Sequence, residues 1–268
     1  MVNMKGRVLI VAGSDSGGGA GIQADIKAVT AMGGFAATAI AALTAQNTQG
    51  VHGVVPVDPA FIAQQIAVVL TDIGADALKT GMLHSAEVIA TVARAFEKHA
   101  GGAPLVVDPV MVAKGGQRLL LSEAETALRD RLLPMAALLT PNLPEAEVLA
   151  GFPVRVEADM ARAAERLMSY GARAVLMKGG HLEGDKVVDL LFAGGQLVER
   201  WEDARIPSRS THGTGCTLAS AIAAGIAQKM SVKGAVERAR AYVRRAIETA
   251  PGFGHGHGPL NHAVTVKS

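Results

Sequence analysis

The stretch STHGTGC at residues 210–216, followed directly by TLASAI at 217–222, joins a glycine-rich turn to an alanine-rich helix. Gly213 and Gly215 let backbone N–H groups approach an anion, and the helix N-terminus adds partial positive charge there. A phosphoryl group in transfer is an anion of the kind that such a turn stabilises. We therefore expect Gly213, Thr214 and Gly215 to form an anion site with a catalytic role.

The only cysteine of the chain, Cys216, stands at the first turn of this helix. The helix dipole favours a thiolate, so the position predicts a lowered pKa and a catalytic role. The alternative is a small buried core residue, which is the most common environment of a free cysteine.

Short apolar runs alternate with helical patterns along the chain. Strands are predicted at 7–12, 36–43, 75–78, 104–107, 137–140 and 172–178, with an edge hairpin at 187–192 and 196–200. Helices are predicted after the glycine loop to about residue 32, from Asp58 through 73, and at 85–99, 123–133, 159–170, 214–230 and 232–249. This alternation is typical of an α/β fold with a mainly parallel sheet that helices cover on both faces. Without a linker or an internal repeat, we expect one domain over residues 1–268.

The composition excludes several classes of protein. Hydrophobic residues make up 49% of the chain and charged residues 19%, which argues against disorder. The net charge of +2 comes from scattered residues, so we expect neither a nucleic-acid partner nor a membrane surface partner. A single cysteine fits a reducing compartment, and the first apolar run stops at Gly13, too early for a signal peptide. These features predict a cytoplasmic protein.

Polar residues follow the predicted strands at the points where those strands end. In a parallel sheet the carboxyl ends of the strands share one edge, and ligands bind there. Six such segments in series predict a ligand site at this edge: 13–21, 46–48, 79–82, 108–111, 140–145 and 178–181.

Two nucleotide-binding motifs are matched only in part. Residues 19–24, GAGIQA, match the letters of the dinucleotide motif, but no acidic residue for the ribose follows at 39–44. Residues 74–80 resemble a P-loop but lack the glycine before Lys79. We discard both interpretations.

Six segments occur together with the turn at 210–216 that ends at Cys216. They are GSDSGGGAGIQAD at 13–25, TAQNT at 44–48, KTGML at 79–83, TPNLPEA at 140–146, MKGGH at 177–181 and HGHGPLNH at 255–262. In this order they resemble hydroxymethylpyrimidine/phosphomethylpyrimidine kinase, the thiamine-pathway member of the ribokinase-like superfamily. The resemblance covers nearly the whole chain. It implies a three-layer α/β/α fold, use of ATP and Mg²⁺, and a possible homodimer. The implied reaction is phosphorylation of 4-amino-5-hydroxymethyl-2-methylpyrimidine, then of its monophosphate to the diphosphate.

The resemblance also assigns substrate-binding positions. Asp25 and Gln46 have the side chains needed to hydrogen-bond the ring nitrogens and amino group of a pyrimidine. Met82 offers a polarisable surface to an aromatic ring, and Gly13 and Val110 complete the expected set. The alternatives are an exposed helix residue for Asp25 and a core residue for Met82.

A second set of positions belongs to the nucleotide and the metal. Asn142 and Glu145 match the Asn-x-x-Glu pattern that the superfamily uses to hold water around Mg²⁺, and Asp108 is expected beside the metal. Lys178 is expected to neutralise charge on the transferring phosphoryl group, and Thr211 and Gly213 to bind the nucleotide. Glu145 also has the compatible role of a carboxylate in the first turn of a helix.

The turn at 210–216, which we call the anion turn, differs in sequence from the matching turn of the superfamily's sugar kinases. Those enzymes carry Gly-Ala-Gly-Asp there, with the aspartate as the base. Here Cys216 takes the place of that aspartate, which fits the pyrimidine-kinase branch. It leaves open whether Cys216 is the base or part of the anion hole. Two other functions also stay open: a pyridoxal or pyridoxine kinase, and a non-catalytic pyrimidine-binding protein.

Overall fold

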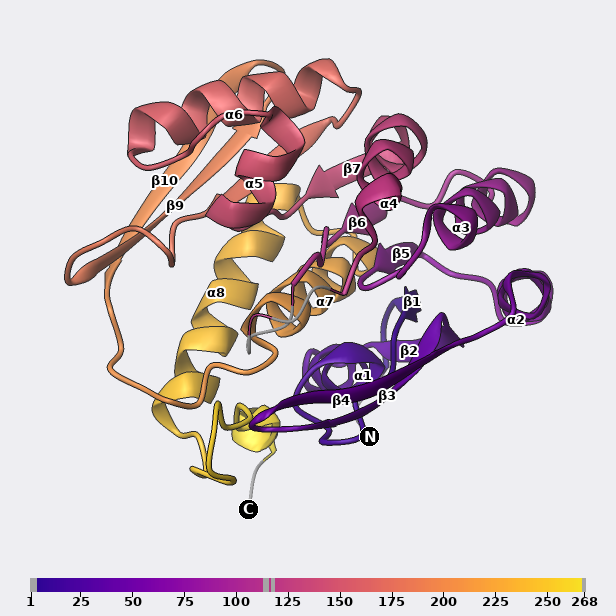
Figure 1. The fold of residues 1–268 in the computed structure, drawn as a ribbon, viewed down its shortest axis with the longest axis horizontal. Coiled ribbons are helices and arrows are strands. Elements are labelled where there is room, and N and C mark those ends of the chain that lie inside the picture. Colours follow the sequence, from indigo (N-terminus) through magenta and orange to yellow (C-terminus); the bar gives the residue numbers. More distant parts are fainter. Residues whose placement is uncertain (1–3, 113–115, 117–118, 267–268) are drawn as a thin grey trace.

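The computed structural model describes residues 4–112, 116 and 119–266. An eight-stranded sheet in the order β10-β9-β8-β7-β6-β5-β1-β2 forms its centre (Figure 1). The strands from β2 to β8 in this order are parallel, and β9 and β10 form an antiparallel hairpin at one edge. The strands are β1 (Arg7–Ala12), β2 (Phe35–Ile40), β5 (Ala77–Thr80), β6 (Leu105–Val107), β7 (Ala136–Leu139), β8 (Ala174–Lys178), β9 (Lys186–Ala193) and β10 (Gln196–Ala204).

Helices cover both faces of this sheet, as the alternating pattern predicts. One face carries α2 (Pro59–Asp72), α3 (Ala86–His99), α4 (Ser122–Ala127), α5 (Leu143–Ala150) and α6 (Glu157–Ser169). The other carries α1 (Gly21–Ala31), α7 (Thr214–Ala227) and α8 (Val232–Glu248). The expected three-layer α/β/α fold is therefore confirmed.

The central strand β1 shows why the apolar runs form a sheet with two covered faces. Successive side chains of a strand point to opposite faces. Leu9 and Val11 pack in the core beneath α2 and α3, while Val8 and Ile10 pack in the core beneath α1 and α7. A strand buried on both faces needs a continuous apolar run, which the sequence supplies here.

The prediction of one strand at 36–43 was wrong. The chain leaves the main sheet after Ile40, and Ala42–Asn47 (β3) pairs antiparallel with Gly50–Pro56 (β4) in a separate two-stranded sheet. The sequence pattern did not indicate β4, whose two glycines and terminal proline are all disfavoured in strands. We call β3 and β4 together the hairpin.

The start of α2 follows the predicted capping chemistry. Asp58 Oδ1 accepts hydrogen bonds from the backbone N–H groups of Ala60 and Phe61, and Pro59 occupies the first helical position. Ile62 and Ile66 are fully buried on the face that meets the sheet. Within the described part of the chain, no helix combines the length and the apolar composition that crossing a bilayer requires.

Candidate active site

The polar segments after β1, β5, β6, β7 and β8 lie at one edge of the sheet, as expected, whereas residues 46–48 lie at the tip of the hairpin. Backbone hydrogen bonds connect neighbouring segments: Gly13 N–H donates to Met82 O (3.1 Å), and Asp108 N–H donates to Thr80 O (2.9 Å). Lys178 N–H donates to Pro141 O at 3.0 Å. These bonds fix the relative positions of the side chains that the sequence singled out.

The turn before α7 is held against the glycine-rich loop after β1. Gly213 caps the helix in the left-handed conformation, with φ of 77°. A Cβ atom at this position would lie 1.8 Å from the carbonyl oxygen of Gly19, so only glycine fits. A Cβ at Gly215 would instead meet Lys178 Nζ at 3.3 Å and Asp108 Oδ2 at 3.8 Å. The backbone of the turn thus faces Lys178 and Asp108.

Asp15 organises the glycine-rich loop, a role that no sequence motif predicted. Its buried carboxylate accepts hydrogen bonds from the N–H groups of Gly17 (2.8 Å), Gly19 (3.1 Å) and Ala20 (2.8 Å). His212 Nε2 lies 2.9 Å from its Oδ2 atom. Burial opposes ionisation, but contact with His212 and these N–H groups holds the pKa of Asp15 below its usual value. The only signal in the sequence is an aspartate within a glycine run.

Asp108 and Lys178 form a buried pair beside the anion turn. Lys178 Nζ donates to Asp108 Oδ1 at 3.2 Å, and Thr140 Oγ1 lies 3.3 Å from the same oxygen. The other oxygen, Asp108 Oδ2, is buried and has no hydrogen-bond partner among the described residues. A buried carboxylate oxygen without a partner suits a hard divalent cation. The residues present therefore fit Mg²⁺ at this position.

Asn142 and Glu145 cap α5 reciprocally. Asn142 Oδ1 accepts from Glu145 N–H at 2.9 Å, and Glu145 Oε2 accepts from Asn142 N–H at 2.8 Å. Burial, opposed by Lys178 and reinforced by Asp108, raises the pKa of Glu145 to about 7. Glu145 thus has the helix-start role that we considered, and it also lies within the electrostatic influence of the Asp108–Lys178 pair.

The structure adds a structural role for Asp25, which we expect to bind the substrate. This side chain is fully buried, and Lys79 Nζ donates to its two oxygens at 2.8 and 2.9 Å. Ser220 Oγ donates to Oδ1 at 2.7 Å. Asp25 is therefore held by three hydrogen bonds from two elements. It links α1, β5 and α7 beneath the anion turn.

The pKa expected for Cys216 is corrected as well. Burial, opposed by Lys79 and reinforced by the carboxylates of Asp25 and Asp108, raises the pKa of the thiol to about 12. The effect of burial therefore exceeds that of the helix dipole. A raised pKa disfavours a resting thiolate, which favours the anion-hole role over the base role.

The remaining predicted substrate residues lie in two adjoining groups. Gln46 Nε2 in the hairpin lies 3.4 Å from His212 Nε2, and Thr44 Oγ1 donates to Gln46 Oε1 at 3.2 Å. Met82 is buried, and a Cβ at Gly13 would lie 2.4 Å from its terminal methyl group. Val110 is half-buried in the turn after Asp108.

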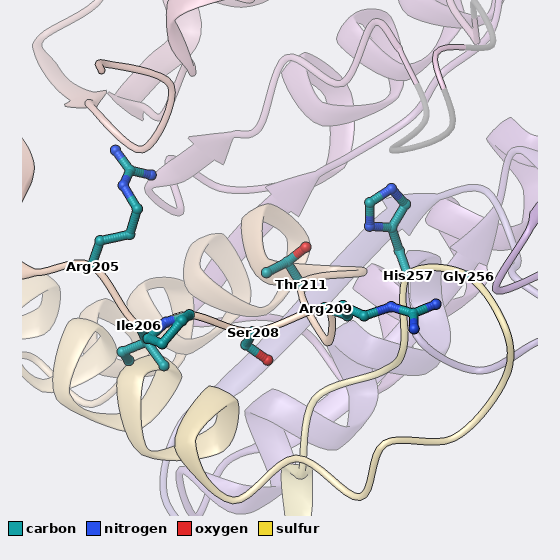
Figure 2. Close-up of a pocket in the computed structure, with 8 residues that line it drawn as sticks. Arg205, Ile206, Ser208, Arg209, Thr211, Gly256 and His257 are labelled. Atoms are coloured by element: carbon teal, nitrogen blue, oxygen red, sulfur yellow. The ribbon is translucent and has the colours of Figure 1, made fainter. Parts of the chain in front are cut away.

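A groove of about 550 Å³ lies beside the anion turn (Figure 2). Its walls come from the segment between β10 and α7 and from the C-terminal segment. Figure 2 shows Thr211 and His257 of these two segments on the same groove. The lining residues are Arg205, Ile206, Pro207, Ser208, Arg209, Thr211, Gly256 and His257.

Comparison with known proteins gives consistent results over nearly the whole chain. A family model described as phosphomethylpyrimidine kinase matches residues 15–261. The hydroxymethylpyrimidine/phosphomethylpyrimidine kinase of Bacillus subtilis is 47% identical over 96% of this chain and 94% of that protein. The thiamine biosynthesis bifunctional protein ThiED of Geobacter sulfurreducens is 51% identical over 98% of this chain. The chain spans only about half, 53%, of that longer protein.

Solved structures agree with the sequence relatives. A pyridoxal kinase from Staphylococcus aureus in complex with AMP-PCP and pyridoxal superposes with a TM-score of 0.90 at 33% identity, covering 98% of this chain and 95% of that one. A phosphomethylpyrimidine kinase from Clostridium difficile gives 0.80 at 40% identity, covering 91% and 100%. The chain thus belongs to the phosphomethylpyrimidine kinase family, and it is a phosphotransferase with a ribokinase-like fold.

Proposed function

We propose that this chain phosphorylates 4-amino-5-hydroxymethyl-2-methylpyrimidine with ATP, and then phosphorylates the monophosphate to the diphosphate used for thiamine. One observation carries the proposal: Gly215, in the first turn of α7, faces the Asp108–Lys178 pair. Backbone N–H donors beside a buried lysine suit a transferring phosphoryl group. The family and the identities above supply the substrate class.

In this proposal the chain acts mainly by positioning and by stabilising charge. The N–H groups of Gly215 and Cys216 bind the phosphoryl oxygens, and Lys178 neutralises charge that develops on them. A neutral Cys216 is compatible with this chemistry, because phosphoryl transfer through a loose transition state needs little base strength.

Mg²⁺ would be held by Asp108, whose Oδ2 has no hydrogen-bond partner within the described chain, and by Glu145 through water. When bound, the ion supplies neutralisation of the nucleotide phosphates. Asn142 orients Glu145 through their reciprocal cap. We place the nucleotide along the groove that Thr211 lines, with Gly213 at its inner end.

The pyrimidine is placed between the hairpin and the glycine-rich loop. Gln46 would hydrogen-bond its ring, and Met82 would contact the ring face beside Gly13. Val110 would cover the far side from the turn after Asp108. Asp25 would hydrogen-bond the ring nitrogens or the amino group, with Lys79 orienting its carboxylate.

One coupled assay tests the proposal. Purified protein with ATP and Mg²⁺ is given the pyrimidine alcohol, its monophosphate or pyridoxal, and ADP release is measured. We expect turnover of the first two at kcat/KM values well above that for pyridoxal. A preference for pyridoxal would favour the second candidate function, which the TM-scores of 0.89–0.90 to pyridoxal kinases support. No ADP release with any of the three would favour the non-catalytic alternative.

We also propose that residues 1–268 form one domain and that the enzyme is a cytoplasmic homodimer. Exposed apolar side chains on the hairpin and on α2 support the dimer: Leu43 is 49% exposed, Val55 63% and Phe61 56%. Cytoplasm supplies the ATP that the reaction consumes. Light scattering of the purified chain tests the dimer, and a monomer at micromolar concentration would refute it.

A further inference from the structure

The C-terminal segment at 253–259, FGHGHGP, lies between two parts of the candidate site. Figure 1 shows this part of the chain, coloured yellow, beside the end of the hairpin. His257 N–H donates to Thr48 O at 2.8 Å, and Gly256 N–H lies 3.3 Å from Thr48 Oγ1. Thr48 belongs to the turn of the hairpin, two residues after Gln46. The segment is therefore fastened to the element that carries Gln46.

The same segment is fastened to the loop before the anion turn. Gly258 N–H donates to Arg209 O at 3.2 Å, and His212 N–H donates to Gly258 O at 3.1 Å. Arg209 also donates from its guanidinium group to His255 O at 2.7 Å. Gly258 thus makes hydrogen bonds to both Arg209 and His212, and His212 directly precedes Gly213.

The close approach of the hairpin turn explains the glycine at position 256. A Cβ there would lie 2.0 Å from Thr48 O, 2.6 Å from Thr48 C and 3.0 Å from Gln49 Cα. All three are backbone atoms, which cannot rotate away as a side chain can. Gly256 has no positive φ, so the close approach alone requires glycine. Any larger residue must separate the segment from the hairpin.

We infer that the segment at 253–259 positions the hairpin over the pyrimidine site, with Gly256 and Thr48 as positioning residues for substrate binding. This inference rests on the proposed function, because it assumes that Gln46 contacts the pyrimidine. The segment holds Thr48 at a fixed distance from the loop at 209–212, and so holds Gln46 beside His212. The hairpin pairs with no other strand in the described structure, and such isolated hairpins are marginally stable. Its position therefore depends on this segment together with the glycine-rich loop, where Ser16 Oγ accepts from the backbone N–H of Gln46 and donates to its carbonyl oxygen, both at 2.8 Å.

The decisive variant is Gly256→Ala, with Gly53→Ala as its matched control. Gly53 lies in the same hairpin, but a Cβ there meets only Ala45 Cβ, at an ordinary 3.9 Å. We expect Gly256→Ala to raise KM for the pyrimidine alcohol about tenfold, the size expected for losing the two hydrogen bonds to Thr48. Its kcat should change less than about twofold, and its KM for ATP, whose proposed groove Gly256 also lines, should rise less than its KM for the pyrimidine alcohol. Gly53→Ala should leave all three unchanged.

Amide hydrogen exchange provides a readout that does not depend on activity. In Gly256→Ala, exchange at residues 42–56 should accelerate, whereas exchange in the central sheet should not. Thr48→Val, which removes one acceptor and keeps the side-chain shape, should show both effects at a smaller, several-fold size. If Gly256→Ala does not fold, Thr48→Val decides the question.

The outcomes separate this inference from the proposed function. A wild-type protein that does not turn over the pyrimidine alcohol refutes the proposed function, while faster hairpin exchange still supports a positioning segment. Unchanged exchange and unchanged KM in both variants overturn the inference. A fall in kcat matched by equal rises in both KM values, together with a lower Tm, would show a purely structural role and would also overturn the inference.

Discussion

The contact between the two glycine-rich segments makes Gly213→Ala the sharpest test of the anion turn. Two effects act at this position. Alanine is strained at φ of 77°, which costs about 1–2 kcal/mol. Its Cβ would also lie 1.8 Å from Gly19 O, whereas real Cβ atoms essentially never approach a heavy atom more closely than 3.0 Å. The turn and the loop at Gly19 must therefore move apart by roughly 1 Å.

A displacement of roughly 1 Å in groups that hold reacting atoms can cost about a hundredfold in rate. Loss of a single donor to the reacting centre costs a hundred- to a thousandfold in kcat. We therefore expect Gly213→Ala to lower kcat by at least about a hundredfold. The measurement is steady-state ADP release with the pyrimidine alcohol at saturating ATP.

Gly33→Ala is the matched control, because it carries the same strain without the clash. Gly33 has φ of 79°, and a Cβ there meets nothing within 4 Å. It should lose stability by about 1–2 kcal/mol and keep its kcat. If Gly213→Ala retains more than about a tenth of wild-type kcat, or if Gly33→Ala loses as much activity, the reasoning about the close approach to Gly19 fails.

Three further predictions concern ionisable groups. Cys216→Ser should keep most of the wild-type kcat and an unchanged pH–rate profile between pH 6 and 9, because burial raises the thiol pKa to about 12. If the variant instead loses an ionisation that the wild-type profile shows, Cys216 is the base. Glu145→Gln should gain stability relative to wild type as pH rises from 5 to 8, because a carboxyl whose pKa is raised to about 7 destabilises the fold once it ionises. Urea unfolding in EDTA measures this, and a pH-independent stability difference would contradict the assignment. The variant should also lose turnover, partly restored by higher Mg²⁺. Lys79→Met should destabilise by about 3–5 kcal/mol by leaving Asp25 charged and buried, and the double variant Lys79→Met with Asp25→Leu should recover much of that loss; additive losses in guanidinium unfolding would show that the pair is not coupled.

The parts of the fold that could be predicted are those with a periodic signal. The buried strands of the central sheet and the capped helix α2 are continuous or regular patterns, so the sequence indicates them directly. The hairpin has no such signal, because Leu43 and Val55 are exposed partners across it and its strands contain glycine and proline. Its position depends instead on tertiary contacts, such as the bonds between Ser16 and Gln46 and the bond between Thr48 and His257.

The candidate site also has parts that could be predicted from the sequence and parts that could not. Asp108 directly follows β6 and Lys178 is the last residue of β8, so the topology alone places them at one edge. The partners of Asp25 could not be predicted. Lys79 lies within an apolar strand and Ser220 within an alanine-rich helix, and neither pattern indicates which side chain will contact a buried carboxylate. Cys216 shows a different limit. The sequence reports the helix N-terminus that lowers a thiol pKa, but burial and the nearby carboxylates, which raise it, exist only in the folded chain.

Glycine in this site is required by close contact, and at Gly213 by a positive φ as well. A Cβ at Gly213 would strike Gly19 O, a Cβ at Gly19 would lie 2.5 Å from His212 Cδ2, and a Cβ at Gly256 would strike Thr48 O. Each of these glycines lets one segment of the site approach another, and each contact involves a segment remote in sequence. The glycine-rich loop, the hairpin turn, the anion turn and the C-terminal segment therefore constrain one another. A side chain added at any of these three positions should alter binding or turnover before it alters the central sheet, whose strands these contacts do not touch.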